Sequence, residues 1–446
     1  MSREKRQEII KAVQAAALAA VEPGSAMRRA LRLEGNLLFV DHKPYDLKDF
    51  DRLWIVGGGK AGAPMAASLW DLLRERITGG AINVKYGHLL PPEQNCGPVI
   101  ITEAGHPTPD EAGYRGAARI VELLSGLTPR DLVLVIISGG GSALMPLPAP
   151  GISLADKQNI TGALLRCGAS IGEINAVRKH LSALKGGQLA RLAQPAALIS
   201  LILSDVVGNP LDVIASGPTV PDTTTFGDAW RVLKKYDLLE KAPSSVKARL
   251  RAGRDGELEE TPKPGDPAFA RAQTVVIGSN ALAAQAAVEK ARELGLKALL
   301  LSTFIEGEAR EVAKVFAGLG KEMARHRRPI SPPACLIAGG ETTVTIRGEG
   351  KGGRNQELAL AAALAIEGWD DLCLASLATD GTDGPTDAAG AIAWGDTVSR
   401  ARALGLDAEA SLADNDSYHF WAALGDLVLT GPTNTNVNDL IFVFTF

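Results

Sequence analysis

The sequence has 446 residues, 46% of them hydrophobic and 22% charged, with a formal net charge of −4. This length predicts about two or three domains with large buried cores. The acidic balance and the lack of a basic block argue against a nucleic-acid partner. No apolar run approaches the ~20 residues that cross a bilayer. We therefore expect a cytoplasmic protein without membrane contact, and the sequence leaves a homodimer open.

The cysteines support this location. Cys96, Cys167, Cys335 and Cys373 stand far apart, without the close pairs that are typical of zinc sites. We expect free buried thiols, as in proteins of a reducing compartment.

Short apolar runs alternate with longer segments of helical period along the whole chain. This alternation is typical of parallel sheets covered by helices on both faces. We predict an α/β protein with two α/β/α domains and mostly parallel sheets. In chain order, strands are expected at residues 53–56, 81–84, 98–102, 132–137, 197–203, 274–277, 298–301, 334–337, 372–377 and 427–429.

A polar, proline-containing stretch near residues 242–269 divides the chain. It contains no long apolar run, so we interpret it as a linker with one short helix. The predicted division is a Rossmann-like α/β domain at 1–240, a linker at 241–267 and a C-terminal α/β domain at 268–446.

Many of the expected strands end in a glycine-containing turn. In doubly wound sheets the carboxyl ends of the strands form the ligand crevice, and helix N-termini there offer N–H groups to anions. Any one turn could be a simple connection, but the set favours an anionic ligand. The turns are residues 56–62, 137–144, 277–280, 338–343 and 378–384.

The first turn, residues 56–62, allows two interpretations. Gly57, Gly59 and Gly62 fit the dinucleotide fingerprint. However, the next strand ends near Lys85 and not at an acidic residue; a lysine there could meet the extra phosphate of NADP. Lys60 inside the turn instead favours a phosphate clamp, in which Gly57, Gly58 and Gly59 would approach the nucleotide.

The second turn follows the most apolar strand. Three consecutive glycines let a backbone approach a triphosphate, and serine hydroxyls can add donors. The alternative is a plain tight turn. The predicted nucleotide-binding residues are Ser138, Gly139, Gly140, Gly141 and Ser142.

A basic segment and a histidine are candidates for binding a small carboxylate. Arg178, Lys179 and His180 crowd one helix, and Lys185 follows it. They could form a solvated basic face, but we predict that Arg178 and Lys185 contact substrate. His106 follows another strand and serves either local hydrogen bonding or substrate contact.

Asp205 lies just past the carboxyl end of the strand at 197–203. A carboxylate there could hold Mg²⁺ or accept the proton of a substrate hydroxyl; the alternative is that it caps the next turn. The stiff loop that follows contains Asn209, which we predict to contact the nucleotide.

The C-terminal half contains two further candidates. Arg354 stands at a predicted helix start, where the dipole disfavours a cation, so we expect an anionic partner. Asp380, Asp383 and Asp387 share one glycine-rich loop. Turn capping is the simpler interpretation, and a shared Mg²⁺ bound through Asp380 is the alternative.

Taken together, these motifs resemble those of the glycerate 2-kinase family. They occur in the family's order at residues 56–62, 103–113, 138–144, 174–190, 203–219, 339–358, 377–391 and 430–440. The resemblance covers nearly the whole chain and implies a C-terminal MOFRL module at about 333–440. One departure is Asn434, where the family pattern leads us to expect glycine.

The resemblance implies two α/β domains with the active site in the cleft between them. It also implies that ATP, Mg²⁺ and D-glycerate give 2-phospho-D-glycerate, with Lys60 and Arg354 as phosphoryl-transfer residues. Two such cations would stabilise the charge of the transition state, and Asp205 would serve as base or metal ligand. An NAD(P)H-dependent hydroxypyruvate reductase is the main alternative, and a non-catalytic sugar-acid sensor is a more remote one.

Overall fold

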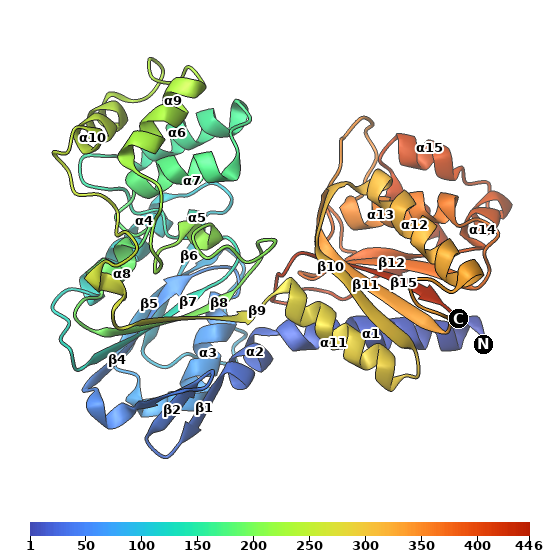
Figure 1. Ribbon diagram of the computed structural model, residues 1–446, viewed down its shortest axis with the longest axis horizontal. Coiled ribbons are helices and arrows are strands. Elements are labelled where there is room, and N and C mark those ends of the chain that lie inside the picture. The colour runs from blue at the N-terminus through green and yellow to red at the C-terminus, as the bar shows by residue number, and fades with distance from the viewer. The chain divides into compact units, whose positions relative to one another are not determined.

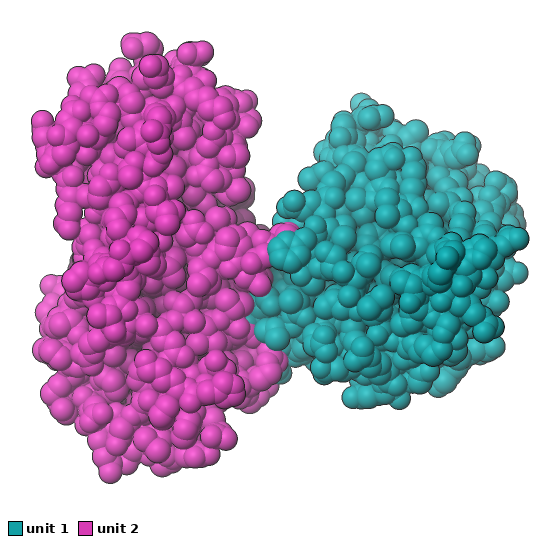
Figure 2. Space-filling view, in the orientation of Figure 1, with its two compact units in different colours: residues 1–25, 278–446 teal, residues 26–277 magenta.

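The computed structural model describes all 446 residues. They form two compact units. The first unit comprises residues 26–277 (unit 2, magenta, in Figure 2), and the second comprises residues 1–25 together with 278–446 (unit 1, teal). Each unit contains a six-stranded sheet.

The sheet of the first unit is doubly wound. Its spatial order is β6-β5-β4-β7-β8-β9, and the recorded pairs from β6 to β8 are all parallel. The chain builds outward from β4 in one direction and then returns to build outward from β7, so the switch point lies between these two strands. The strands are β4 (Arg52–Gly58), β5 (Gly79–Lys85), β6 (Val99–Ala104), β7 (Asp131–Ile137), β8 (Ala197–Leu203) and β9 (Ala272–Gly278).

Helices cover both faces of this sheet (Figure 1). Every residue of β7 and β8 is buried, as expected of central strands. One face carries α3 (Gly62–Leu73), and the other carries α4 (Glu111–Leu123) and α8 (Gln188–Leu192), with the one-turn α5 (Gly141–Leu144) at the end of β7.

Four further helices form a layer with its own core. Leu164, Val177, Phe226 and Leu250 are among its buried side chains. The helices are α6 (Leu154–Arg166), α7 (Ile171–His180), α9 (Phe226–Lys235) and α10 (Ser244–Arg254). The unit is completed by an antiparallel meander of β1 (Leu31–Glu34), β2 (Leu37–Val40) and β3 (Lys43–Asp46). Short 3₁₀ turns lie at Leu47–Asp49, Arg74–Arg76, Ile214–Ser216 and Pro267–Phe269.

The sheet of the second unit is mixed. Only β10 and β11 are parallel, and the pairs from β11 to β14 are antiparallel. The expectation of a mostly parallel sheet is therefore wrong for this unit, because the buried C-terminal strand returns between β11 and β12. In spatial order the strands are β10 (Lys297–Glu308), β11 (Ala334–Thr343), β15 (Asp439–Thr445), β12 (Leu372–Ala378), β13 (Gly390–Trp394) and β14 (Leu427–Val428).

Helices again flank the sheet on both faces (Figure 1). The first helix of the chain, α1 (Arg3–Val21), packs beside α11 (Asn280–Glu293), and α2 (Pro23–Ala30) follows it. Arg3 anchors α1 through an ion pair of 2.8 Å to Asp396. The opposite face carries α12 (Ala309–His326), α13 (Arg354–Ala365), α14 (Thr397–Ala403), α15 (Ala408–Ala413) and α16 (Ser417–Leu424).

The α/β class is confirmed, and each expected strand is present. The expected domain limits differ from the two units. The supposed linker carries α10, whose Val246 and Leu250 are buried in the helical core, and β9 completes the first sheet. None of the helices combines the length and the apolar character that crossing a bilayer requires.

Candidate active site

The two glycine turns of the first unit interlock at the switch point. The amide of Lys60 donates to the carbonyl of Gly139 at 2.8 Å, and the amide of Ala61 donates to Oγ of Ser138 at 3.0 Å. Ser138 is buried, so its hydroxyl holds the two turns together. The turns that follow β4 and β7 thus form one rigid surface where a doubly wound sheet binds its ligand.

Two of the fingerprint glycines are required by this close approach. A Cβ on Gly57 would lie 2.0 Å from the carbonyl oxygen of Ile136, and one on Gly59 would lie 2.1 Å from Oγ of Ser138. Both glycines also have positive φ angles, 140° and 150°. The close approach of β4 to β7 explains Gly57, and the contact between the two turns explains Gly59, without a dinucleotide.

Asp205 and His106 flank the second turn. A Cβ on Gly139 would lie 2.4 Å from Oδ2 of Asp205, and one on Gly140 would lie 2.9 Å from Cδ2 of His106. Burial, with the nearby charge of Lys60, lowers the pKa of His106 to about 4. His106 is therefore a neutral imidazole near pH 7.

The ammonium of Lys60 lies in this surface. The side chain is half-buried and makes no hydrogen bond or ion pair within the protein. Its backbone is fixed on both sides, since its carbonyl also contacts Nδ1 of His88 at 3.1 Å. A cation held in place without a protein carboxylate suits an anionic ligand.

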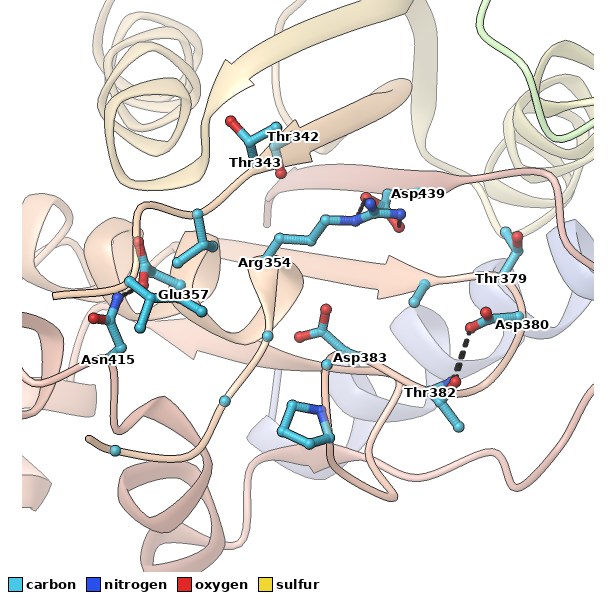
Figure 3. A pocket seen from close by; sticks show the side chains of 18 of the residues that line it. Thr342, Thr343, Arg354, Glu357, Thr379, Asp380, Thr382, Asp383, Asn415 and Asp439 are labelled. Carbon is cyan, nitrogen blue, oxygen red and sulfur yellow. Dashed lines mark hydrogen bonds and ion pairs between the residues drawn. The ribbon is translucent and has the colours of Figure 1, made fainter. Parts of the chain in front are cut away.

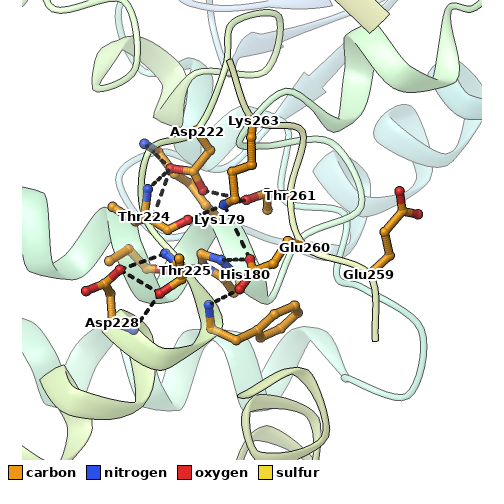
Figure 4. A network of polar contacts seen from close by, with 12 residues as sticks. Lys179, His180, Asp222, Thr224, Thr225, Asp228, Glu259, Glu260, Thr261 and Lys263 are labelled. Atoms are coloured by element: carbon orange, nitrogen blue, oxygen red, sulfur yellow. Dashed lines mark hydrogen bonds and ion pairs between the residues drawn. The ribbon is translucent and has the colours of Figure 1, made fainter. Parts of the chain in front are cut away.

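The three basic side chains of helix α7 have two different roles. Lys179 pairs with Asp222 at 3.2 Å and Asp212 at 3.3 Å, and Nε2 of His180 contacts Glu260 at 3.0 Å (Figure 4). Both side chains therefore belong to a buried structural network. Arg178 takes no part in it, so it is the residue of the three that stays available to a ligand.

Two lysines lie close enough to Arg178 to be perturbed by its charge. Nζ of Lys185 donates to the carbonyl of Ser142 at 2.7 Å, and Nζ of Lys157 donates to the carbonyl of Pro146 at 3.0 Å. Burial is the main cause that lowers the pKa of both amines, and the positive charge of Arg178 lowers it further. The structure therefore brings Arg178 and Lys185 together behind the second glycine turn.

Ser142 and Asn209 are both held by contacts within the first unit. Oγ of Ser142 lies 2.8 Å from Oγ of Ser216, which donates to Asn175 at 3.1 Å. Asn209 occupies a left-handed turn with φ 54°, in which its amide donates to the carbonyl of Val206 at 3.0 Å. Its predicted contact with a nucleotide stays a prediction.

The second unit contains a polar cavity of about 620 Å³. Figure 3 shows Arg354 and Asp439 on one side of it and the loop of Asp380 and Asp383 on another. Threonine, asparagine and glycine residues form much of the remaining wall. They include Thr342, Thr343, Gly352, Gly353, Thr379, Thr382, Asn415 and Asn436.

Arg354 has the anionic partners that its place at a helix start demands. Its Nη1 lies 2.6 Å from Oε1 of Glu341, and its Nε lies 2.6 Å from Oδ2 of Asp439. These carboxylates raise the pKa of Arg354 although burial opposes them. Burial raises the pKa of Asp439 to about 7, although Arg354 lowers it.

The N-terminus of α13 is occupied by another carboxylate. Oδ1 of Asp383 accepts from the amide of Asn355 at 3.1 Å, and Oδ2 accepts from the amide of Gln356 at 2.8 Å. Asp383 is buried, and burial raises its pKa. It occupies the place that a phosphate would take at a helix N-terminus.

The two candidate metal ligands fit Mg²⁺ to different degrees. Across the chain, no three acidic, histidine or cysteine side chains gather as a metal cluster, but Mg²⁺ commonly uses one or two carboxylates with substrate phosphates. Asp205 fits this pattern because it faces the turn of Gly139. Oδ1 of Asp380 caps its own turn, accepting from the amide of Thr382 at 3.0 Å.

Comparisons with known proteins identify the family. A family model described as a domain of unknown function (DUF4147) matches residues 9–251, and the MOFRL family model matches residues 334–439. A D-glycerate 2-kinase from Thermotoga maritima is 45% identical over 393 residues, which cover 88% of this chain and 90% of the relative. The chain belongs to the glycerate 2-kinase family.

The fold agrees with that of the family. The crystal structure of a glycerate kinase from Thermotoga maritima matches with a TM-score of 0.89 at 41% identity, covering 99% of this chain and 100% of that one. A relative from Agrobacterium vitis, 43% identical over 87% of this chain and 86% of its own, carries the provisional name of a hydroxypyruvate reductase. The names of the relatives therefore differ.

Asn434, where the family pattern suggested glycine, has a glycine-like backbone. Its φ angle is 57°, a left-handed conformation that asparagine adopts more readily than most residues. The side chain is exposed and is not part of the cavity wall. The departure from the family pattern therefore leaves the turn intact.

The predicted residues fall into two groups within the family fold. Lys60, Ser138, His106, Asp205 and the glycines between them lie together in the first unit. Arg354 and Asp380 line the cavity of the second unit. Sequence reasoning missed Lys157, Glu341 and Asp439. The signal for Lys157 was its place on the apolar face of α6, three residues before the buried Ile160.

Proposed function

We propose that this protein is a glycerate 2-kinase that transfers the γ-phosphoryl group of ATP to the 2-hydroxyl of D-glycerate. Membership of the family supports this function. The observation that carries it is the pair of interlocked glycine turns with the unpartnered Lys60 at the switch point. Such a surface offers backbone amides and one cation to a polyphosphate.

The first unit supplies groups for the nucleotide phosphates. The turn at 57–59 and the turn at 138–142, with Asn209 at the edge, contact the phosphates. Lys60 neutralises charge that develops on the transferred group, which is the main demand of phosphoryl transfer. Asp205 would hold Mg²⁺, which would supply further positive charge for the nucleotide phosphates.

The same unit also supplies groups for glycerate. Arg178 and Lys185 bind its carboxylate, and neutral His106 hydrogen-bonds a hydroxyl. Asp205 takes the proton of the 2-hydroxyl, whose oxygen then bonds to the γ-phosphorus. The bond between that phosphorus and the bridging oxygen breaks, and ADP leaves. Asp205 thus serves either as the base or as the metal ligand. Either role requires a carboxylate beside Gly139, where Asp205 lies.

Arg354 is the second cation in the proposal. Because Glu341 and Asp439 hold its guanidinium, it needs little reorganisation when charge develops on a phosphoryl group. Asp380 is the second candidate for Mg²⁺, since only its Oδ1 is used by the turn. Both roles are proposals drawn from the chemistry of the side chains.

A coupled assay tests the proposal directly. The protein is mixed with D-glycerate, ATP and Mg²⁺, and enolase is added without a phosphoglycerate mutase. Phosphoenolpyruvate, followed by its ultraviolet absorbance, is the expected product because enolase accepts only the 2-phosphate. Formation of ADP without phosphoenolpyruvate would indicate that the phosphate is transferred to the 3-hydroxyl. If no ADP formed, the proposal that the protein is a kinase would be wrong.

The reductase alternative has weaker support. Gly57 and Gly59 are explained by the contact with Ile136 and Ser138, and β5 ends at Lys85 without the acidic residue that binds a ribose. Hydroxypyruvate with NADH or NADPH, without ATP, should therefore give no change in nicotinamide absorbance. Steady oxidation of either cofactor would favour the reductase.

We also propose a cytoplasmic location. The structure contains no disulfide, and Cys96, Cys335 and Cys373 are buried free thiols, whereas Cys167 is exposed, contrary to expectation. Free thiols are usual in a reducing compartment. A homodimer stays a prediction, and light scattering measures it.

A further inference from the structure

The helical layer of the first unit contains a buried cluster of positive charge. Lys157 is 6% exposed and Lys185 is 2% exposed. Lys157 donates only to the carbonyls of Pro146 and Leu147, at 3.0 and 3.4 Å, and Lys185 only to that of Ser142. Arg178, whose charge acts on both lysines, makes no hydrogen bond or ion pair.

No carboxylate compensates this cluster. Besides burial, the groups that lower the pKa values of these amines are cations: Arg178 acts on Lys157, and Lys157 and Arg178 act on Lys185. Lys179 shows how a buried lysine is usually compensated, because it forms ion pairs with Asp222 and Asp212. A buried charge without a partner is costly, so this arrangement indicates that something other than the protein supplies the anion.

A neutral donor lies at the same place. Asn175 is 3% exposed, and its Nδ2 has no partner. Its Oδ1 is engaged by Ser216, which also contacts Ser142, the residue whose carbonyl binds Lys185. An unsatisfied buried amide needs an explanation, and an acceptor oxygen of a ligand provides one.

We propose that Lys157 joins Arg178 and Lys185 in the carboxylate subsite for glycerate and that this subsite takes up a proton when the anion binds. The inference rests on the proposed function for the identity of the anion. The cluster itself requires only a small carboxylate.

The proton comes from solvent and is added to an amine. Burial lowers the pKa of Lys157 from 10.5 to about 7 and lowers that of Lys185 well below its usual value. Lys157 is therefore largely neutral at pH 8. Burial also disfavours the ammonium form of Lys185, and Arg178 carries the charge. A bound carboxylate favours the ammonium form, so one of the lysines gains a proton and becomes a second cation for the ligand.

Calorimetry measures this uptake without any variant. D-glycerate is titrated into the ADP-loaded enzyme at pH 8 in two buffers that differ in ionisation enthalpy. The difference in heat gives the protons taken up, which we expect to be ~1 per glycerate because linkage converts a pKa shift into bound protons. Binding without any proton uptake, or no binding by an enzyme that turns over glycerate, would overturn the inference.

A variant assigns the effect to Lys157. Lys157→Met keeps the length of the side chain and removes the amine, and Lys234→Met changes an exposed lysine of the same layer. We expect KM for D-glycerate to rise on the order of 10- to 100-fold in Lys157→Met, as losing a charged hydrogen bond does, with KM for ATP unchanged. Lys234→Met should match the wild type.

Thermal stability separates a binding role from a structural one. Without ligand, Lys157→Met should melt no lower than the wild type, because it replaces a buried amine that has no carboxylate partner with an apolar side chain of similar length. It should also lose most of the rise in Tm that D-glycerate gives the wild type. A lower melting temperature with an unchanged KM would make Lys157 structural. The coupled assay tests the kinase activity separately. If the wild type is active in that assay while Lys157→Met shows an unchanged KM, the proposed subsite is refuted and the proposed function stands.

Discussion

The guanidinium of Arg354 is held by the buried carboxylate of Asp439, with 2.6 Å between Nε and Oδ2. Asp439 is the first residue of β15 and lies opposite Gly340 of β11 and Ala378 of β12. Three strand ends therefore meet where α13 begins. The arginine is oriented before any ligand arrives, as electrostatic catalysis requires.

The two proposed cations should differ in their effect on stability. Lys60→Ala and Arg354→Ala should each lower kcat at least ~100-fold, about 3 kcal/mol, as losing one preorganised charge does. Lys60→Ala should leave Tm unchanged because the ammonium has no partner in the protein. Arg354→Ala should lower Tm because Asp439 is left buried and unpaired.

Steady-state kinetics and thermal melts check both variants. Arg115→Ala, at an exposed site of α4, serves as the control and should behave as the wild type. Near-normal turnover in Lys60→Ala or Arg354→Ala would remove that residue from the mechanism.

Asp439 should make stability depend on pH. Burial raises its pKa from 3.8 to about 7 in the folded protein, so the folded state binds more protons than the unfolded state between these values. The contribution of Asp439 to the free energy of unfolding therefore falls as pH rises from about 4 to 7. Asp439→Asn should flatten this part of the profile.

Urea denaturation at several pH values measures the slope. Asp370→Asn, an exposed carboxylate of the same unit, should leave the profile unchanged. Equal slopes for the wild type and Asp439→Asn would show that Asp439 is ionised throughout this range.

Asp383 should support both the helix and Arg354. Removing its two bonds to the amides of α13 should cost about 1–2 kcal/mol of stability, as losses of helix caps do. Because Arg354 is the first residue of that helix, kcat should also fall in Asp383→Ala. Asp407 caps α15 in the same way, through the amides of Glu409 and Ala410.

Asp407→Ala is therefore the matched control. It should lose stability but keep its kcat, since α15 begins away from the cavity wall. If Asp383→Ala keeps normal turnover while losing stability, the cap has no role in placing Arg354.

Gly59 should tolerate no side chain. A Cβ there would lie 2.1 Å from Oγ of Ser138 and 2.7 Å from its amide, so Gly59→Ala must separate the two turns and should abolish measurable kinase activity. Gly172 has open space around it and lies in the first turn of α7. Gly172→Ala should be fully active and slightly more stable. Wild-type turnover by Gly59→Ala would show that the interlock is dispensable.

The sequence pattern predicted features that depend on neighbouring residues in the chain. Continuous apolar runs identified the buried strands β7 and β8, and glycines after strands identified the turn of Lys60. The partners of Arg354 were not predictable in this way. Glu341 lies on β11 and Asp439 on β15, and only the pairing of the strands brings them to the start of α13.

The mixed second sheet escaped prediction for a related reason. An apolar run of β-forming residues such as residues 439–445 does not say in which direction it will pair. Lys157 was missed because helix periodicity marks a face as buried without saying what chemistry that face contacts. Its neighbours, Arg178 and Lys185, come from later segments that pack against α6 only in the folded layer.

The first helix of the chain belongs to the unit that the ribosome makes last. Ile10, Val13, Ala17 and Val21 on α1 are fully buried, and α1 packs beside α11, which begins at Asn280. Domains generally fold in the order in which they are synthesised, but this helix must wait, with its apolar face unburied, until most of the polypeptide has emerged. A nascent chain halted before α11 should therefore expose α1 to proteases and chaperones, while residues 26–277 already fold.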